Sequence, residues 1–209
     1  MPVDAVMRHG AAFLALLGAC TLAQAQAQAQ TQTQTQTQAS SAPAKDRLAV
    51  CAACHGAEGV APSPAIPALA GQPKLFIENQ LVLMREGLRE VPAMQAAVAG
   101  LSDEEIVALA RHYAALPLKT APGPLQADKQ RAGAALSKQG GCGSCHLPDY
   151  RGQNQVPRLA GQHEAYLLAS MKQFRDQPGP GRDTIMAATL RGISDADLDR
   201  LAHYLAQAP

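Results

Sequence analysis

CAACH at residues 51–55 and CGSCH at residues 142–146 are the two stretches that determine the fold we expect for this chain. Both have the form Cys-x-x-Cys-His, and they begin 91 residues apart. Farther along, PALAGQ at residues 67–72 corresponds to PRLAGQ at residues 157–162, at an offset of 90. Landmarks that recur in the same order at a fixed spacing are typical of a duplicated structural unit. The sequence therefore predicts two tandem copies of one fold.

A third landmark completes the repeat and sets its limits. Met94 and Met186 are each followed eight residues later by a Ser-Asp pair. Between the copies, KTAPGPL at residues 119–125 contains Pro-Gly-Pro, a strong signal for a connecting loop. We expect the first domain at residues 45–118, a linker at 119–126 and the second domain at 127–209.

Each copy has the apolar spacing of α-helices, and no segment alternates as a strand does. In the first copy, the inward face of the middle helix is expected to carry Ile77, Leu81, Met84 and Leu88. In the second copy, the matching face carries Leu167, Met171 and Phe174. The last helix of each copy should begin at a capping serine, Ser102 or Ser194. We therefore expect an all-α fold made of two small helical bundles.

The Cys-x-x-Cys-His pattern is the attachment site of c-type haem. Two thiols one helical turn apart can bond to the two vinyl groups on one porphyrin edge, and the following histidine then binds the iron. We expect two covalent haem groups, at Cys51, Cys54, Cys142 and Cys145, with His55 and His146 on the irons.

The cysteines allow three other interpretations. A thioredoxin-like dithiol needs a preceding strand and an α/β sheet, which neither copy offers. A zinc site would have to join pairs that lie 91 residues apart, each with its own histidine. A disulfide within each pair would leave both histidines without a role.

The second axial ligand of each iron must come from farther along the chain. Met94 and Met186 lie 39 and 40 residues after the haem histidines, each in a predicted loop before a capped helix. Thioether sulfur favours Fe(II) and fills the coordination shell, which suits electron transfer rather than substrate binding. The weaker candidates are Met84 and Met171, which fall on apolar helix faces, and His112, His163 and His203.

The loops at Pro67 and Pro157 follow each haem histidine at a similar distance. A backbone carbonyl in this loop is expected to accept the Nδ1 proton of the histidine, which orients the ring and strengthens its bond to the iron. An ordinary rigid turn is the alternative.

Composition and charge narrow the class of protein further. The formal net charge is +1, aromatic residues make up 3% of the chain, and there is no Trp. Nucleic-acid binding needs a clustered basic face, so we do not expect it. Two domains of fewer than about 90 residues with few large apolar side chains usually need a cofactor, a metal or disulfides to be stable.

The N-terminus has the pattern of an export signal. Residues 11–19 (AAFLALLGA) form an apolar run far shorter than the roughly 20 residues that span a bilayer, and Ala-Gln-Ala follows at residues 23–25. We expect a signal peptide at residues 1–25, then a disordered Gln-rich linker at 26–44. Leu-Gly-Ala-Cys at residues 17–20 resembles a bacterial lipobox, so the alternative is a signal at 1–19 and a lipid anchor on Cys20.

The tandem Cys-x-x-Cys-His motifs, the Pro-x-Leu-Ala-Gly-Gln loops and the late Met followed by Ser-Asp resemble the di-haem cytochrome c4 family. The resemblance covers residues 45–209. It implies two tandem class I cytochrome c domains with facing haem edges, in a periplasmic carrier that delivers electrons to a terminal oxidase. The Gln-rich tether departs from the family pattern. The copies also differ before the methionine, with GLREV at residues 87–91 and DQPGPGR at 176–182.

We therefore expect a respiratory electron carrier and not an enzyme. A cytochrome bc complex or a dehydrogenase would be its donor and a terminal oxidase its acceptor. The main alternative is a haem-bearing subunit of a flavocytochrome-type dehydrogenase complex. A di-haem peroxidase is a further alternative, but it needs one iron with an open face and usually a longer chain.

Overall fold

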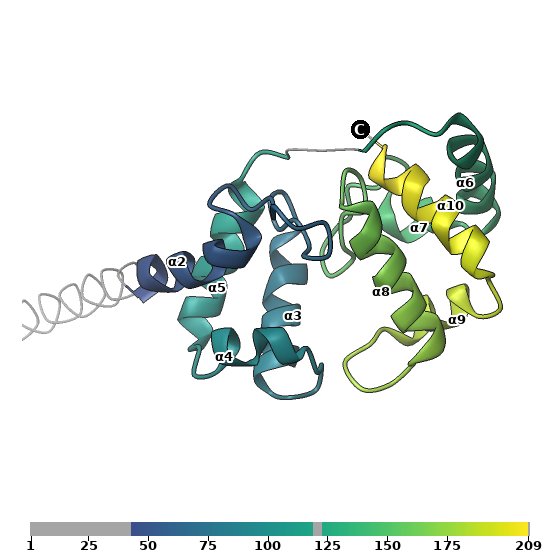
Figure 1. Ribbon diagram of the computed structural model, residues 1–209. Coiled ribbons are helices and arrows are strands. Elements are labelled where there is room, and N and C mark those ends of the chain that lie inside the picture. The colour runs from purple at the N-terminus through teal and green to yellow at the C-terminus, as the bar shows by residue number, and fades with distance from the viewer. Residues whose placement is uncertain (1–42, 119–122, 209) are drawn as a thin grey trace, which may run out of the picture. The chain divides into compact units, whose positions relative to one another are not determined.

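The computed structural model describes residues 43–118 and 123–208. The predicted signal segment, Cys20 and nearly all of the Gln-rich stretch lie outside the described residues. From Ala44 onward the chain forms one compact unit. Within the described residues the regular elements are helices, apart from one isolated bridge between Gln153 and Val156 (Figure 1). The predicted all-α fold is confirmed.

The helices follow the predicted repeat, and we call residues 43–118 the first copy and residues 123–208 the second copy. The helices of the first copy are α2 (Pro43–His55), α3 (Lys74–Arg85), the short 3-10 helix η1 (Pro92–Met94), α4 (Gln95–Val98) and α5 (Asp103–Ala115). Those of the second copy are α6 (Ala127–Gln139), α7 (Cys142–His146), α8 (Glu164–Asp176), α9 (Thr184–Leu190) and α10 (Asp195–Ala206). No helix among these is long and apolar enough to cross a membrane.

The core of the first copy lies where α3 packs against α5. Ile77, Leu81 and Met84 project from α3 into this core, as their spacing predicts. The prediction that Leu88 extends this inward face is wrong, because Leu88 is 51% exposed. The helix ends at Arg85, and Gly87 then turns the chain with a φ of 69°, a conformation that favours glycine.

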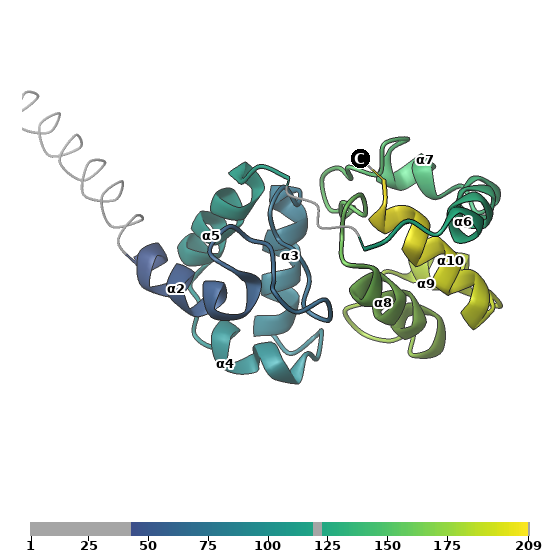
Figure 2. The same cartoon turned by 45° about the horizontal axis from the view of Figure 1, so that its top comes forward.

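The core of the second copy is built around α10, which packs against both α6 and α8 (Figure 2). Leu167 and Met171 of α8 are buried, and Phe174 packs against the cluster from its edge. Gly133 of α6 marks the closest approach of two helices, since a Cβ atom there would collide with the Arg200 carbonyl and the Tyr204 side chain of α10. Only glycine allows the two helix backbones to lie this close.

Both final helices begin at the predicted serine caps. The Ser102 hydroxyl accepts a hydrogen bond from the Glu105 amide at 3.2 Å, and the Glu105 carboxylate accepts one from the Ser102 amide at 2.9 Å. The reciprocal pair is a capping box that satisfies two amides at the helix start. In the second copy, the Ser194 hydroxyl accepts from the Asp197 amide at 3.1 Å.

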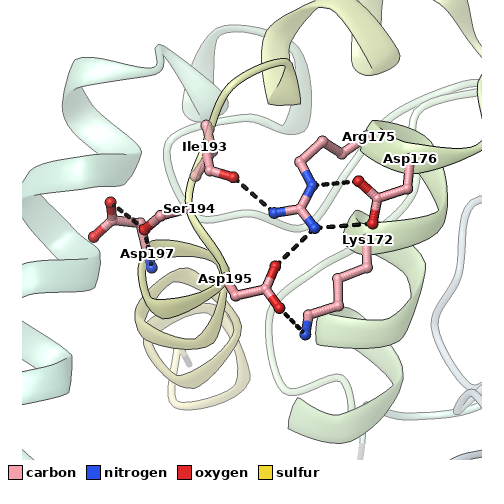
Figure 3. A network of polar contacts seen from close by, with 7 residues as sticks. All are labelled: Lys172, Arg175, Asp176, Ile193, Ser194, Asp195 and Asp197. Atoms are coloured by element: carbon pink, nitrogen blue, oxygen red, sulfur yellow. Dashed lines mark hydrogen bonds and ion pairs between the residues drawn. The ribbon is translucent and has the colours of Figure 1, made fainter.

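A repeated arginine, which the sequence analysis did not single out, joins the end of each middle helix to the start of the last helix. In the second copy, Arg175 of α8 donates to the Ile193 carbonyl at 2.8 Å and pairs with Asp195 and Asp176 (Figure 3). Lys172 lies on the other oxygen of Asp195 at 2.7 Å. In the first copy, Arg85 makes the matching contacts with the carbonyl of Leu101, with Asp103 and with Glu86.

Candidate haem-attachment sites

The four cysteines of the two motifs lie on short helical turns that end at a histidine. Cys51 and Cys54 occupy the last turns of α2, which ends at His55. In the second copy the same five residues form the separate helix α7, because Gly141 has a φ of 65° and breaks the chain away from α6. Within each pair the first thiol is half-buried and the second exposed, and all four are free. Both pairs are therefore available for covalent attachment.

The two motif histidines have nearly identical surroundings. His55 is 6% exposed, and its Nδ1 lies 2.9 Å from the Pro67 carbonyl oxygen. His146 is 7% exposed, and its Nδ1 lies 2.8 Å from the Pro157 carbonyl oxygen. The hydrogen bond that the sequence analysis expected is thus present in both copies.

The electrostatics favour neutral imidazole rings that can bind a metal. Burial lowers the pKa of His55 and of His146 below the usual 6.5, and the hydrogen bonds to Pro67 and Pro157 offset this only in part. A carbonyl oxygen can only accept, so Nδ1 carries the proton and the lone pair is left on Nε2. This is the tautomer that binds iron through Nε2 while the backbone orients the ring.

Of the four methionines considered, two are core residues and two lie at the edge of a core. Met84 and Met171 are each 6% exposed within the two hydrophobic clusters, as their helix positions predicted. Met94 and Met186 are partly buried and pack against the edges of the same clusters. Both lie on the segment between the middle and last helices.

The local structure at these two methionines differs from the predicted loops. Met94 is the last residue of the 3-10 helix η1. Met186 lies inside α9, whose start is capped by Asp183 through a hydrogen bond from the Met186 amide at 2.8 Å. The Pro-Gly-rich insertion before α9 obscured this short helix in the sequence.

The remaining histidines are occupied elsewhere. His203 is fully buried. Its Nδ1 lies 2.9 Å from the Glu164 carboxylate, and its Nε2 accepts from the Gln126 backbone N–H at 3.1 Å. His163 is half-buried, and its Nε2 lies 3.1 Å from the Ala61 carbonyl oxygen. His112 packs edge-on against Tyr113. Within the described residues, no group of three or more His, Cys, Asp or Glu side chains is placed to hold a metal ion.

One buried charge, missed by the sequence analysis, tests whether the chain fits a haem group. Arg158 is 1% exposed, and it donates to the Ala70 carbonyl at 2.9 Å and to the Ala160 carbonyl. Its Nε has no hydrogen-bond partner in the described part of the chain. Burial lowers its pKa to about 10, and no carboxylate of residues 43–118 or 123–208 pairs with it. An isolated buried cation is costly without an anion. The carboxylates of a haem are anions of the required kind, so the residues present fit this cofactor.

Comparison with known proteins defines the class. Residues 130–209 match the family model described as "Cytochrome c", and residues 41–112 match "Cytochrome C oxidase, cbb3-type, subunit III". Each match contains one Cys-x-x-Cys-His motif. The chain is therefore a di-haem c-type cytochrome that binds two covalent haem c groups.

Similarity along most of the chain then gives the particular family. Cytochrome c4 of Pseudomonas aeruginosa is 30% identical over 170 residues, which cover 76% of this chain and 84% of that protein. A "Thiosulfate dehydrogenase electron acceptor" of Thiomonas intermedia is 32% identical and covers 81% of this chain and 83% of its own. The crystal structure of reduced cytochrome c4 from Pseudomonas stutzeri has a TM-score of 0.72 at 28% identity, covering 80% and 97% of the two chains. This chain belongs to the cytochrome c4 family and is a di-haem electron carrier.

Proposed function

We propose that Cys51 and Cys54 hold the first haem and that Cys142 and Cys145 hold the second. The axial ligands would be His55 with Met94, and His146 with Met186. The observation that carries this assignment is the duplicated hydrogen bond from the histidine Nδ1 to a proline carbonyl, at 2.9 and 2.8 Å. It supports the assignment because it leaves Nε2 of a buried neutral ring available in both copies.

The protein's role would be to pass electrons without catalysing a reaction. Bound haem supplies an iron that cycles between Fe(II) and Fe(III). With histidine and methionine both holding the iron, no position would remain for a substrate. A di-haem peroxidase would instead need one iron with an open face.

We further propose an exported, periplasmic carrier with domains at residues 45–118 and 127–209 joined by a linker at 119–126. The export pattern of residues 1–25 supports this location, and the lipobox-like residues 17–20 support a form anchored through Cys20. A cytochrome bc complex or a dehydrogenase would reduce it, and a terminal oxidase would oxidise it.

The spectrum of the oxidised protein tests the ligand assignment. A methionine sulfur bound to ferric haem gives a weak charge-transfer band at the red end of the visible spectrum, and we expect it from both haems. Met94→Ala should remove the contribution of the first haem, open its iron to carbon monoxide and lower its potential, because a thioether ligand favours Fe(II). Met84→Leu is the matched control, since Met84 lies in the core. An unchanged spectrum in Met94→Ala would show that the ligand lies elsewhere.

A second candidate function is that of electron acceptor or haem subunit for a dehydrogenase. The relative from Thiomonas intermedia and one from Stutzerimonas stutzeri, 34% identical over 77% of its length, are both named as thiosulfate dehydrogenase electron acceptors. A thiosulfate dehydrogenase (TsdBA) structure from Marichromatium purpuratum also aligns with 76% of this chain at a TM-score of 0.68, although this chain covers only 36% of it. Rapid haem reduction by a thiosulfate dehydrogenase and thiosulfate would support this role. Reduction by a cytochrome bc complex but not by the dehydrogenase would favour the first candidate function, that of a respiratory carrier.

A further inference from the structure

Two buried glutamines, Gln72 and Gln162, form reciprocal hydrogen bonds between the two copies. They occupy equivalent positions in the repeat and are 4% and 3% exposed. The Gln162 amide accepts from the Ala68 backbone N–H at 2.8 Å and donates to the Ala68 carbonyl at 2.9 Å. The Gln72 amide makes the same two contacts with Arg158, both at 3.0 Å. Each glutamine therefore binds the backbone of the opposite copy.

The contacted amides belong to the peptide groups that also hold the haem histidines. The Ala68 N–H and the Pro67 carbonyl are parts of one peptide group, and that carbonyl accepts from His55 Nδ1 at 2.9 Å. A continuous chain of hydrogen bonds thus runs from His55 through this peptide group to Gln162. An equivalent chain runs from His146 through the peptide between Pro157 and Arg158 to Gln72.

A peptide group transmits polarisation because its nitrogen, carbon and oxygen share one resonant system. When its N–H donates a hydrogen bond, its oxygen gains electron density and becomes a better acceptor. A better acceptor draws the Nδ1 proton of the histidine and makes Nε2 a stronger donor to a metal. A stronger donor stabilises Fe(III) relative to Fe(II) and lowers the reduction potential.

We propose that each glutamine is a positioning residue for the iron ligand of the opposite copy: Gln162 acts on His55, and Gln72 acts on His146. This inference rests on the proposed assignment of both histidines as axial ligands. Under this proposal, the hydrogen bonds between the copies influence the histidine ligand of each iron. The potential of the first haem then depends on a side chain of the second copy, and that of the second haem on a side chain of the first.

The test uses the intact di-haem protein with Gln162→Leu, which removes both hydrogen bonds to Ala68, and the one from the His163 backbone N–H at 2.9 Å, while keeping most of the side-chain volume. The potentials of both haems are measured by redox titration and assigned to each copy by NMR of the axial-ligand protons. We expect the potential of the first haem to rise and the His55 ring protons to shift, while the second haem keeps the wild-type values. Gln72→Leu should produce the mirror result at the second haem.

His163→Leu is the matched control. The contact of His163 with the Ala61 carbonyl also joins the copies, but it touches neither histidine-bound peptide group. The control should leave both potentials unchanged. A shift confined to the haem of the mutated copy, equal shifts at both haems, or no shift at all would overturn the proposal.

Glutamate variants keep the test decisive if the leucine variants lose haem. Gln162→Glu retains an acceptor for the Ala68 backbone N–H, so it should not raise the reduction potential of the first haem. Any change should be larger at the first haem than at the second. Gln72→Glu should reverse this order, and the same order in both variants would contradict the proposal. Failure of the ligand assignment itself would be distinguishable, because the wild-type spectrum would then lack the methionine band.

Discussion

Nη2 of Arg175 lies 2.7 Å from Oδ1 of Asp195, and this ion pair joins the two ends of the segment that carries Met186. The same arginine donates to the Ile193 carbonyl at 2.8 Å, so the segment is closed by a backbone contact as well (Figure 3). Arg85 closes the equivalent segment around Met94 through Asp103, at 2.8 Å, and the Leu101 carbonyl. The two arginines therefore limit how far each methionine can move.

Arg175→Gln is expected to loosen Met186 selectively. Without the arginine the segment loses its closing contacts, so the methionine should leave the second iron at a lower temperature than in the wild type. Heating while recording the methionine charge-transfer band measures this directly. Arg85→Gln is the internal control and should affect the first haem instead; loss of both haem signals together in either variant would contradict a local role.

Asp195 should make stability depend on acid pH. Hydrogen bonds from Lys172 and then from Arg175 hold the pKa of Asp195 below its usual 3.8. Because the folded-state pKa is depressed, this contribution is fully present above the unfolded value and is lost as the pH falls through the folded value. Asp195→Asn should therefore lower the free energy of unfolding near neutral pH and approach the wild type in acid. Urea unfolding across a pH series measures this, with Glu104→Gln, at an exposed residue, as the control. A difference in unfolding free energy between Asp195→Asn and the wild type that does not change with pH would contradict the prediction.

Gly133→Ala should destabilise the second copy. A Cβ atom would collide with the backbone of α10 at Arg200, and overpacking of this kind costs about 1–3 kcal/mol. Thermal or urea unfolding of the holoprotein measures the loss. Gly143→Ala is the control, because the nearest atom to its added Cβ is Pro148 Cα at 3.5 Å and the first copy already has Ala52 there. Equal stability of the two variants would refute the close helix contact.

Arg158→Leu should lower at least one haem potential. If Arg158 lies beside a haem, as its burial without a partner carboxylate suggests, its positive charge would disfavour the ferric state, and removing it would lower the potential. Redox titration of the variant against Arg111→Leu, an exposed arginine on α5, separates a local effect from a change in net charge. An unchanged pair of potentials would contradict the placement of Arg158 beside a haem.

Much of this architecture was predictable because its signals are local. The starts of both final helices were predicted, since their serine caps are visible in the sequence as Ser-Asp pairs. Met84 and Met171 were recognised as core residues because helical spacing places them on apolar faces. The recurrence of Pro67 and Pro157 at similar distances after the haem histidines led to the prediction that a backbone carbonyl in each loop accepts from the histidine, and the proline carbonyls do so.

What sequence patterns did not reveal depends on contacts between distant residues. The bonds of Gln162 to Ala68 span 94 positions, and no local pattern marks their partners. The buried state of Arg158 was also unforeseen, because arginine is usually exposed, although a charged residue at the position of Ala68 in an otherwise matching loop was a visible difference. Leu88 was misplaced because one glycine ended its helix earlier than the apolar spacing indicated.

The exchange of Ala68 for Arg158 between the two loops has a consequence for where an electron resides. Two identical halves would give irons of equal energy, and a single electron would be shared evenly between them. A buried cation in only one of the two loops would make the electrostatic surroundings of the two irons unequal. We therefore expect the half-reduced molecule to hold its electron mainly on one of the two haems.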